Sequence, residues 1–206
     1  MARGSVAVVD YGGGNVGSLL ASLGRRGVRA TFASDPREVR GADAVILPGD
    51  GAFGATMQAL RERGLDAALK DVIDSGRALL GICVGMQLLF ESSTEFGGES
   101  GFGVLHGRVD RFTGAPRVPH VGWNRLEIVA LHPLVEGIED GAYVYFLHSY
   151  CAPVGVETVA ATTHGQRFAA VVAAGNVMGT QFHPEKSQRT GAMVLDNFIA
   201  LAKRAR

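Results

Sequence analysis

Residues 77–90 read Arg-Ala-Leu-Leu-Gly-Ile-Cys-Val-Gly-Met-Gln-Leu-Leu-Phe. The apolar run at residues 78–80 predicts a short, buried strand. Gly81, Cys83 and Gly85 follow with the spacing of a nucleophile elbow, in which cysteine takes the place more often held by serine. Because the two glycines allow a sharp reversal of the chain, we expect the Cys83 thiol at the tip of a strand-to-helix turn.

The thiol also has a simpler interpretation. Free cysteines are most often small, buried core residues, and residue type alone favours that role for Cys83. The flanking glycines and the helix predicted for residues 86–90 favour a nucleophile instead. The rest of the chain has to decide between the two.

Length and composition limit the possible classes of protein. A chain of 206 residues suits one well-filled domain, so we expect residues 1–206 to form a single unit. The 20 basic and 20 acidic residues balance, which argues against a nucleic-acid partner. Two cysteines, Cys83 and Cys151, make no disulfide framework and favour a reducing compartment. The apolar N-terminal run is too short for a signal peptide or a membrane span, so we expect a soluble cytoplasmic protein.

Apolar strands alternate with helical patterns through the first half of the chain. Short apolar or β-branched runs predict strands at residues 6–9, 28–33, 44–47 and 78–80. Helices are predicted at 16–26, from the N-cap at Ser34-Asp35-Pro36, and at 53–75 with a break at Gly64. This alternation indicates an α/β fold, whose mostly parallel central sheet has helices on both faces.

The second half of the chain has a different pattern of predicted secondary structure. Short strands are predicted at residues 108–112, 125–129, 143–148, 158–163, 168–173 and 177–181. They indicate an antiparallel or mixed section appended to the parallel core. Residues 187–204 predict a closing amphipathic helix, whose apolar side chains available to the core are Met193, Val194, Leu195, Phe198 and Leu201.

A second pattern that can carry chemistry is His183-Pro184-Glu185. In an extended chain, residues i and i+2 point to the same side, so the Glu185 carboxylate can lie beside the His183 imidazole. A carboxylate in that place orients the base of a nucleophile–base–acid triad. A solvated surface pair and a metal pair are the alternatives, although no third ligand has a suitable spacing for a metal. Together with the elbow, this pattern predicts a triad of Cys83, His183 and Glu185.

A triad of this kind needs backbone N–H groups that stabilise an oxyanion. One donor should be the N–H of Val84, directly after the nucleophile. The loop at residues 47–51, Leu-Pro-Gly-Asp-Gly, follows a neighbouring predicted strand and can supply a second donor from Asp50 or Gly51. An ordinary glycine turn is the alternative interpretation of this loop.

The N-terminal glycines allow a different function. The segment from Gly12 to Gly17 matches the G-x-G-x-x-G fingerprint after a predicted strand, and Asp35 follows at about the distance of a ribose-binding acid. A dinucleotide-binding module is therefore an alternative to an enzyme with a triad. It is the weaker hypothesis, because residues 10–11 separate the strand from the glycines and because it leaves the elbow and His183 unexplained.

The two chemical patterns resemble the nucleophile and His/Glu motifs of the class I, triad-type glutamine amidotransferases. These motifs are Gly-Ile-Cys-Val-Gly-Met-Gln at residues 81–87 and Gln-Phe-His-Pro-Glu at residues 181–185. Further segments resemble one branch of that family, the glutaminase subunits of imidazole glycerol phosphate synthases, which serve histidine biosynthesis. They lie at residues 10–15, 48–54, 119–124, 145–150 and 184–187, and Pro-His-Val-Gly-Trp-Asn at 119–124 is the most specific. The resemblance covers nearly the whole chain.

This resemblance implies a three-layer, flavodoxin-like amidotransferase fold and a glutaminase that needs no cofactor. In the family, the cysteine attacks the side-chain amide of glutamine and the histidine protonates the departing ammonia. Water then releases glutamate from a γ-glutamyl thioester. The resemblance also implies that the side chains of Gln87 and Glu95 contact the glutamine, together with the backbone around His148, Ser149 and Tyr150.

The resemblance implies a partner as well. In this family the ammonia passes to a (β/α)8 cyclase subunit, which forms imidazole glycerol phosphate and an aminoimidazole carboxamide ribotide. We therefore expect a heterodimer, with a docking face that includes His120, Trp123, Asn124, Tyr145 and Lys186. A buried core aromatic is the alternative for Trp123, and a solvated charge is the alternative for Lys186. An alternative interpretation of the whole protein is the glutaminase subunit of a different amidotransferase.

One residue departs from the family pattern. Asp50 stands in the oxyanion loop, where the family usually has a small apolar residue. We expect its carboxylate to point to solvent or to the partner, because a negative charge inside the site would disfavour an oxyanion. The resemblance also implies low activity of the isolated chain and stimulation by the cyclase subunit, and we expect that a peptide of this loop rotates before its N–H faces the site.

Overall fold

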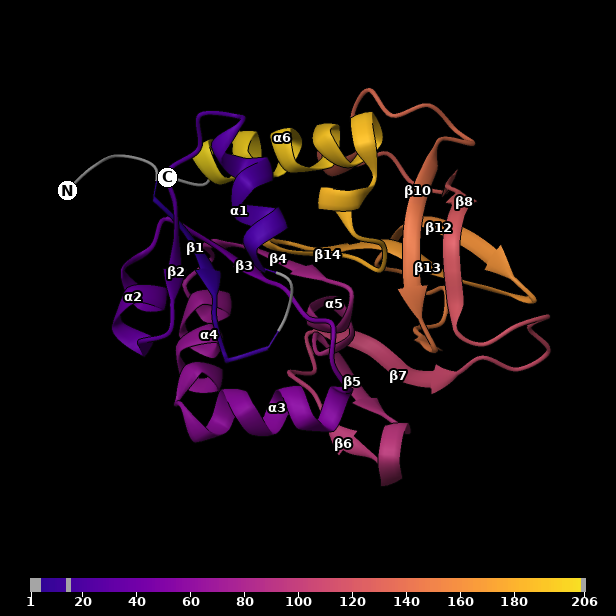
Figure 1. Cartoon of the computed structure of the whole chain (residues 1–206), viewed down its shortest axis with the longest axis horizontal. Helices are drawn as coiled ribbons and strands as arrows, with labels where there is room; N and C mark the ends of the chain where they lie inside the picture. The colour runs from indigo at the N-terminus through magenta and orange to yellow at the C-terminus, as the bar shows by residue number, and fades with distance from the viewer. Residues whose placement is uncertain (1–4, 14–15, 205–206) are drawn as a thin grey trace.

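The computed structural model describes residues 5–13 and 16–204 (Figure 1). Within these residues, eight strands form the main sheet in the order β2-β1-β3-β4-β14-β13-β12-β9. Its parallel part consists of β1 (Val6–Val9), β2 (Ala30–Ala33), β3 (Ala44–Leu47), β4 (Ala78–Ile82) and β14 (Val177–Thr180). The antiparallel part consists of β13 (Gln166–Ala174), β12 (Thr158–His164) and β9 (Glu127–Ile128).

The central parallel strands are buried along their whole length. Every residue of β1, β3 and β4 is buried, and the three strands contain no polar side chain. A strand that is covered on both faces needs apolar residues throughout, rather than the alternation of a half-exposed strand. The prediction of an α/β fold with a mostly parallel core is therefore confirmed.

Helices cover both faces of this sheet, as predicted. Figure 1 shows α1 (Val16–Gly24) and α6 (Gln188–Arg204) on one face, and α3 (Phe53–Glu62) and α4 (Leu65–Asp74) on the other. α2 (Pro36–Gly41) packs against α4. No helix in the described part of the chain combines the length and the apolar character that crossing a membrane requires.

The helix termini follow local rules. Asp35 is the N-cap of α2, and its carboxylate accepts a hydrogen bond from the N–H of Arg37 while Glu38 completes a capping box. Gly64 separates α3 from α4 with a φ of +66°. Both features were predicted, and the carboxylate of Asp35 is thereby committed to a helix cap. Gly14 and Asn15, in the middle of the predicted glycine fingerprint, lie outside the described residues.

The closing helix buries the side predicted for it. Val194, Leu195 and Phe198 of α6 are buried in the core, whereas Met193 and Leu201 are half-buried at its margin. The apolar stripe of the helix is therefore slightly rotated from the predicted one, and buries Ile199 in addition.

Two smaller sheets lie beside the main sheet. One pairs β8 (His120–Arg125) with β10 (Tyr143–His148), and β8 contacts β12. The other has the order β11 (Tyr150–Cys151), β7 (Leu105–Arg111), β5 (Phe90–Ser93) and β6 (Glu99–Ser100). Short helical turns complete the chain: α5 (Val84–Gln87), η1 (Glu95–Gly97), η2 (Pro133–Val135) and η3 (Pro184–Lys186).

The helix predicted for residues 86–90 is wrong in length. α5 ends at Gln87, and the chain enters strand β5 at Phe90. The carbonyl groups of Leu88 and Leu89 accept hydrogen bonds from the N–H groups of Phe102 and Val104, at 2.7 and 2.9 Å. A distant loop thus takes the acceptors that a longer helix would need.

Two strand predictions also change. The strand predicted at residues 125–129 is divided at Leu126, so that its first part pairs with β10 and its second part with β12. The strand predicted at 177–181 is β14, which is parallel to β4 and antiparallel to β13. It is therefore the point where the parallel part of the sheet meets the antiparallel part.

Substitution by alanine should have opposite effects on stability at Gly54, within α3, and at Gly64, which follows α3. Gly64→Ala should lower the free energy of unfolding by about 1 kcal/mol, because an L side chain resists its positive φ. Gly54→Ala should raise it by about 0.5–1 kcal/mol, since Gly54 is helical and an added Cβ would stay 3.9 Å from Glu99. Urea denaturation of both variants checks this pair, and equal signs would contradict it.

Candidate functional site

The elbow at Cys83 has the strained geometry that the sequence predicts. Cys83 follows β4 with φ 53° and ψ −112°, and α5 begins at the next residue. A Cβ on Gly85 would lie 1.9 Å from the carbonyl oxygen of Leu47, and a Cβ on Gly81 would lie 2.5 Å from that of Gly85. Only glycine fits at these two positions, so the turn holds a cysteine in a conformation that cysteine alone would not choose.

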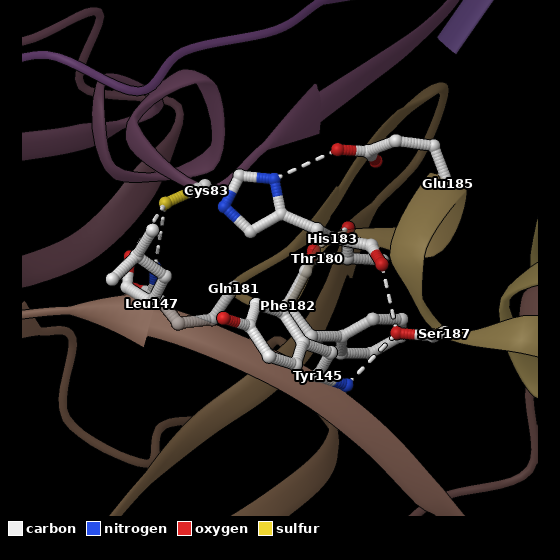
Figure 2. A network of polar contacts seen from close by, with 9 residues as sticks. All are labelled: Cys83, Tyr145, Leu147, Thr180, Gln181, Phe182, His183, Glu185 and Ser187. Atoms are coloured by element: carbon white, nitrogen blue, oxygen red, sulfur yellow. Dashed lines mark hydrogen bonds and ion pairs between the residues drawn. The ribbon is translucent and has the colours of Figure 1, made fainter. Parts of the chain in front are cut away.

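Strand pairing brings the elbow next to the His183 segment. β14 lies parallel to β4, with Thr180 opposite Ile82, and the N–H of Cys83 donates to the carbonyl of Thr180 at 2.8 Å. Both strands end at the same edge of the sheet, so the residues that follow them lie side by side. Figure 2 shows Nε2 of His183 facing the sulfur of Cys83, with Glu185 on the far side of the ring.

His183 and Glu185 form a buried pair. Their Nδ1 and Oε1 atoms are 2.9 Å apart, while His183 Nε2 and Glu185 Oε2 are buried without a hydrogen-bond partner. Burial by itself lowers the pKa of His183, but the Cys83 sulfur and the Glu185 carboxylate outweigh burial and raise that pKa to about 10. A ring with this pKa carries a proton at neutral pH and can deliver it from Nε2.

The reason predicted for this contact was wrong, although the contact itself is present. The sequence prediction assumed an extended chain, whereas residues 184–186 form the short helical turn η3. Ser187 holds this turn, because its hydroxyl donates to the carbonyl of His183 at 2.7 Å and accepts from the N–H of Tyr145 at 2.9 Å. The role of Ser187 was not predicted.

The predicted oxyanion hole is not open in this structure. The N–H of Val84 donates to the carbonyl oxygen of Gly49 at 3.3 Å, so the peptide before Asp50 presents an acceptor where a donor is needed. Asp50 and Gly51 are exposed. This orientation agrees with the expectation that a peptide of the loop rotates before its N–H faces the site, and the donor roles of Val84, Asp50 and Gly51 stay predictions.

A cavity of about 320 Å³ opens beside the thiol. Its lining brings together the predicted substrate contacts Gln87, Glu95, His148, Ser149 and Tyr150 with Cys83, Val84 and Asp50. No set of three or more His, Cys, Asp and Glu side chains converges as metal ligands in the described residues. The cavity is lined by one thiol and by amide and carboxylate side chains, together with apolar and aromatic residues.

Two of the predicted substrate contacts already have protein partners. The Nε2 atom of Gln87 donates to the carbonyl of Tyr150 at 2.9 Å and to Oε1 of Gln181 at 3.0 Å. The Oε2 atom of Glu95 accepts from the N–H of Phe53 at 2.7 Å, at the start of a helix whose N-cap residue has no side-chain hydrogen bond. Gln181, whose Nε2 lies 3.7 Å from the Cys83 sulfur, was not predicted.

The residues predicted for docking divide into two groups. Trp123 is 45% exposed and Tyr145 and Lys186 are half-buried beside it, with Lys186 Nζ 5.8 Å from the Tyr145 ring centre. Asn124 is half-buried and turned inward to His120. His120 is only 4% exposed, so its place on a docking face is corrected to the interior. The core alternative for Trp123 is wrong.

The pairing of β8 with β10 explains this division. Trp123 lies opposite Tyr145 and Val121 opposite Leu147, and these residues share the outer side of the pair. Val121 and Leu147 are exposed apolar residues that sequence reasoning missed. The alternation of outward and inward residues along both strands was the signal that could have found them. We call Val121, Trp123, Tyr145 and Leu147 the β8–β10 face.

Comparisons with known proteins agree with one another. The family model described as "Glutamine amidotransferase class-I" matches residues 7–201. Imidazole glycerol phosphate synthase subunit HisH of Sulfurimonas denitrificans is 44% identical over 200 residues, which cover 94% of this chain and 96% of the relative. The HisH subunit of Halobacterium salinarum is 48% identical over 204 residues, which cover 95% and 92%.

Solved structures share the fold at lower identity. A crystal structure of a glutamine amidotransferase matches with a TM-score of 0.76 at 23% identity, and the match covers 96% of this chain and 98% of that one. The glutaminase domain of Trypanosoma brucei CTPS, solved with bound acivicin, matches with a TM-score of 0.70 at 17% identity over 97% and 94%. These matches show the fold alone.

The raised pKa of His183 predicts a pH-dependent stability. The ordinary pKa of 6.5 applies to the unfolded chain, so the charged ring stabilises the fold fully below pH 6.5 and loses this effect as pH rises to about 10. Glu185→Gln removes the carboxylate that supports the charge. The free energy of unfolding should therefore differ most between wild type and variant near pH 6.5 and converge towards pH 10. Denaturant titrations at several pH values measure this difference, and a constant difference would count against the charged ring.

Proposed function

This chain belongs to the class-I glutamine amidotransferase family, and we propose that it is the glutaminase subunit of an imidazole glycerol phosphate synthase. It hydrolyses glutamine to glutamate and supplies the ammonia to a cyclase in histidine biosynthesis. The observation that carries the proposal is the meeting of a thiol in a strained turn, a buried imidazole and a buried carboxylate at one edge of the sheet. The identity of 44–48% to HisH subunits over almost the whole chain supports the choice of synthase.

The proposed reaction has two halves, the formation and the hydrolysis of a thioester, and each member of the triad acts in both. The sulfur of Cys83 attacks the side-chain carbonyl carbon of glutamine, and the proton on Nε2 of His183 passes to the departing nitrogen, which leaves as ammonia. A γ-glutamyl thioester remains. The neutral His183 then takes a proton from water as that water attacks the thioester, and the sulfur leaves as the thiolate while glutamate is released, which restores the starting pair of thiolate and charged ring. Glu185 orients the ring through Nδ1 and stabilises its charge.

The closed oxyanion loop supports low activity of the isolated chain. With the Gly49 carbonyl bonded to the Val84 N–H, neither the N–H of Val84 nor that of Asp50 faces a developing oxyanion. Removal of one such donor costs enzymes about 10²–10³ in kcat. Rotation of the peptide between Gly49 and Asp50 would turn the N–H of Asp50 inward and release the N–H of Val84.

The β8–β10 face is the proposed docking site for the (β/α)8 cyclase subunit. It presents aromatic and aliphatic side chains to solvent, a composition favoured at interface cores. The backbone of Tyr145 holds the catalytic segment directly, because its carbonyl accepts from the N–H of His183 at 3.0 Å. A small cavity of about 60 Å³ is lined by His183, Glu185 and Lys186, by Leu147 of this face, and by residues of α1 and of the loop at residues 48–50. It has room for one small molecule and gives the ammonia a place to leave.

Substrate contacts and domain organisation follow the same proposal. Gln87, Glu95 and residues 148–150 line the 320 Å³ cavity, and we propose that the two side chains and the backbone around 148–150 hold the glutamine there. The chemistry needs no cofactor. We propose residues 1–206 as one functional domain, because one cluster of buried apolar side chains extends from β1 through β14 to α6.

The thiol provides the first test. Cys83→Ala should reduce glutamine-dependent turnover of the complex to background while leaving the use of free ammonia by the cyclase intact, because only the nucleophile is lost. Cys151→Ala is the matched control, since Cys151 is a buried thiol outside the cavity lining. Glutamate formation, measured with and without a cyclase subunit, decides the outcome. Turnover in the Cys83 variant, or full-rate hydrolysis by the isolated wild-type chain, would contradict the proposal.

A charge reversal tests the docking site. Lys186→Glu should lower cyclase-stimulated hydrolysis by about tenfold or more, because a cation beside the aromatic face is replaced by an anion. Lys203→Glu, at the exposed end of α6, is the control with the same change of charge. Titration of each variant with the cyclase subunit gives the affinity and the maximal stimulation. Equal effects of the two reversals would place the docking site elsewhere.

A further inference from the structure

Two buried histidines outside the proposed triad connect strand β8 to the wall of the glutamine cavity. Nδ1 of His120 lies 3.1 Å from Nε2 of His148, and Nδ1 of His148 lies 2.8 Å from the carbonyl oxygen of Tyr150. On the other side, Nε2 of His120 lies 3.3 Å from Nδ2 of Asn124. The proposed chemistry uses neither ring, so these contacts call for an explanation of their own.

The direction of each hydrogen bond between Asn124 and Tyr150 follows from the groups at the two ends of this series. The Tyr150 carbonyl can only accept, so His148 carries its proton on Nδ1 and offers a bare Nε2. His120 must therefore donate from Nδ1 and accept at Nε2. The amide of Asn124 is oriented independently, because Nδ2 donates to the carbonyl of Thr163 at 3.0 Å and Oδ1 accepts from the N–H of Arg125 at 2.8 Å. The Tyr150 carbonyl at one end and the Asn124 amide at the other therefore require the same tautomers, in which His120 and His148 each carry the proton on Nδ1.

The surroundings keep both rings neutral. The His120 ring stacks between Phe146, at 4.8 Å, and His164, at 4.1 Å between ring centres. Burial lowers the pKa of His120 to about 4, with the His164 ring adding to the effect. Burial likewise lowers the pKa of His148 to about 3. Both rings are therefore neutral throughout the neutral pH range, and the hydrogen bonds select one tautomer of each.

The chain of contacts continues from Tyr150 to the nucleophile. Its carbonyl also accepts from Nε2 of Gln87, which donates to Oε1 of Gln181 at 3.0 Å. Nε2 of Gln181 in turn lies 3.7 Å from the sulfur of Cys83. A continuous series of contacts, made by groups that are nearly all buried, therefore connects Asn124 to the cavity.

We propose that Asn124, His120 and His148 form a one-directional hydrogen-bond relay that positions the Tyr150 carbonyl and carries the docking of a partner on β8 into the glutamine cavity. The three are positioning residues, since none of them touches the reacting atoms. The roles of partner and glutamine rest on the proposed function, whereas the relay itself rests on the contacts above. A fixed Tyr150 backbone preorganises the cavity wall, so the relay acts on substrate binding more than on the chemical step.

Nitrogen NMR of the wild-type chain tests the relay without any variant. At neutral pH, His120 and His148 should each show a protonated Nδ1 and a bare Nε2. Asn124→Asp places an oxygen against Nε2 of His120 and should protonate that nitrogen. A charged ring, or an Nε2–H tautomer of either histidine in the wild type, overturns the proposal.

Kinetics of the complex with its cyclase test the consequence. His120→Leu should raise the KM for glutamine about tenfold with kcat within about twofold, because one buried hydrogen bond is lost. His120→Asn keeps a donor near the position of Nδ1 and should restore the KM to within about threefold. His164→Leu is the control, since the His164 ring stacks on His120 outside the relay.

The outcomes separate this proposal from the proposed function. An unchanged KM in His120→Leu, or an equal rise in His164→Leu, overturns the relay, and melting temperatures of all variants exclude a general loss of structure. If the wild-type complex hydrolyses no glutamine at all, the proposed function fails. The nitrogen signals of His120 and His148 then decide the relay on their own.

Discussion

The parallel pairing of β4 with β14 is the constraint on which the rest of the site depends. It sets Thr180 opposite Ile82 and ties the N–H of Cys83 to the carbonyl of Thr180. The chain approaches itself so closely here that a Cβ on Gly179 would lie 2.6 Å from the Met86 side chain. A larger residue would push α5 and the elbow away from β14, and would thereby separate the sulfur from the imidazole.

The site departs from the usual rule that buried polar atoms are paired. In the described residues, the buried side-chain nitrogen and oxygen atoms without a hydrogen-bond partner are Tyr11 Oη, His183 Nε2 and Glu185 Oε2. Two belong to the proposed triad, and Tyr11 lies near the oxyanion loop, where burial and the Asp50 carboxylate raise its pKa to about 12. An unpaired buried group typically costs about 1–3 kcal/mol. Such costs concentrate at functional sites, where a substrate or a moving loop can supply the missing partner.

Local rules account for what the sequence predicted well. The cap at Asp35 and the break at Gly64 depend only on residues within one turn of each other. The elbow glycines form a local sequence pattern, although Gly85 is also required by the distant carbonyl oxygen of Leu47. The predictions that failed involve distant partners. The helix after Cys83 ends because the N–H groups of residues 102–104 bond to the carbonyl groups that a longer helix would use. His120 points inward because the pairing of β8 with β10 decides which alternate residues of β8 face the interior. The alternation of residues along one strand does not by itself tell which of the two faces of that strand is buried.

The sequence by itself determined the parallel α/β core and the chemical groups of the site, because buried strands, sharp glycine turns and a His-Pro-Glu segment leave local patterns. It also placed Asp50 in a loop beside the elbow. Only the tertiary structure decided that the Gly49 carbonyl occupies the Val84 N–H, that η3 brings Glu185 to His183, and that His120 lies inside. Each of these depends on backbone orientation or strand register, which are settled by contacts between segments far apart in the chain.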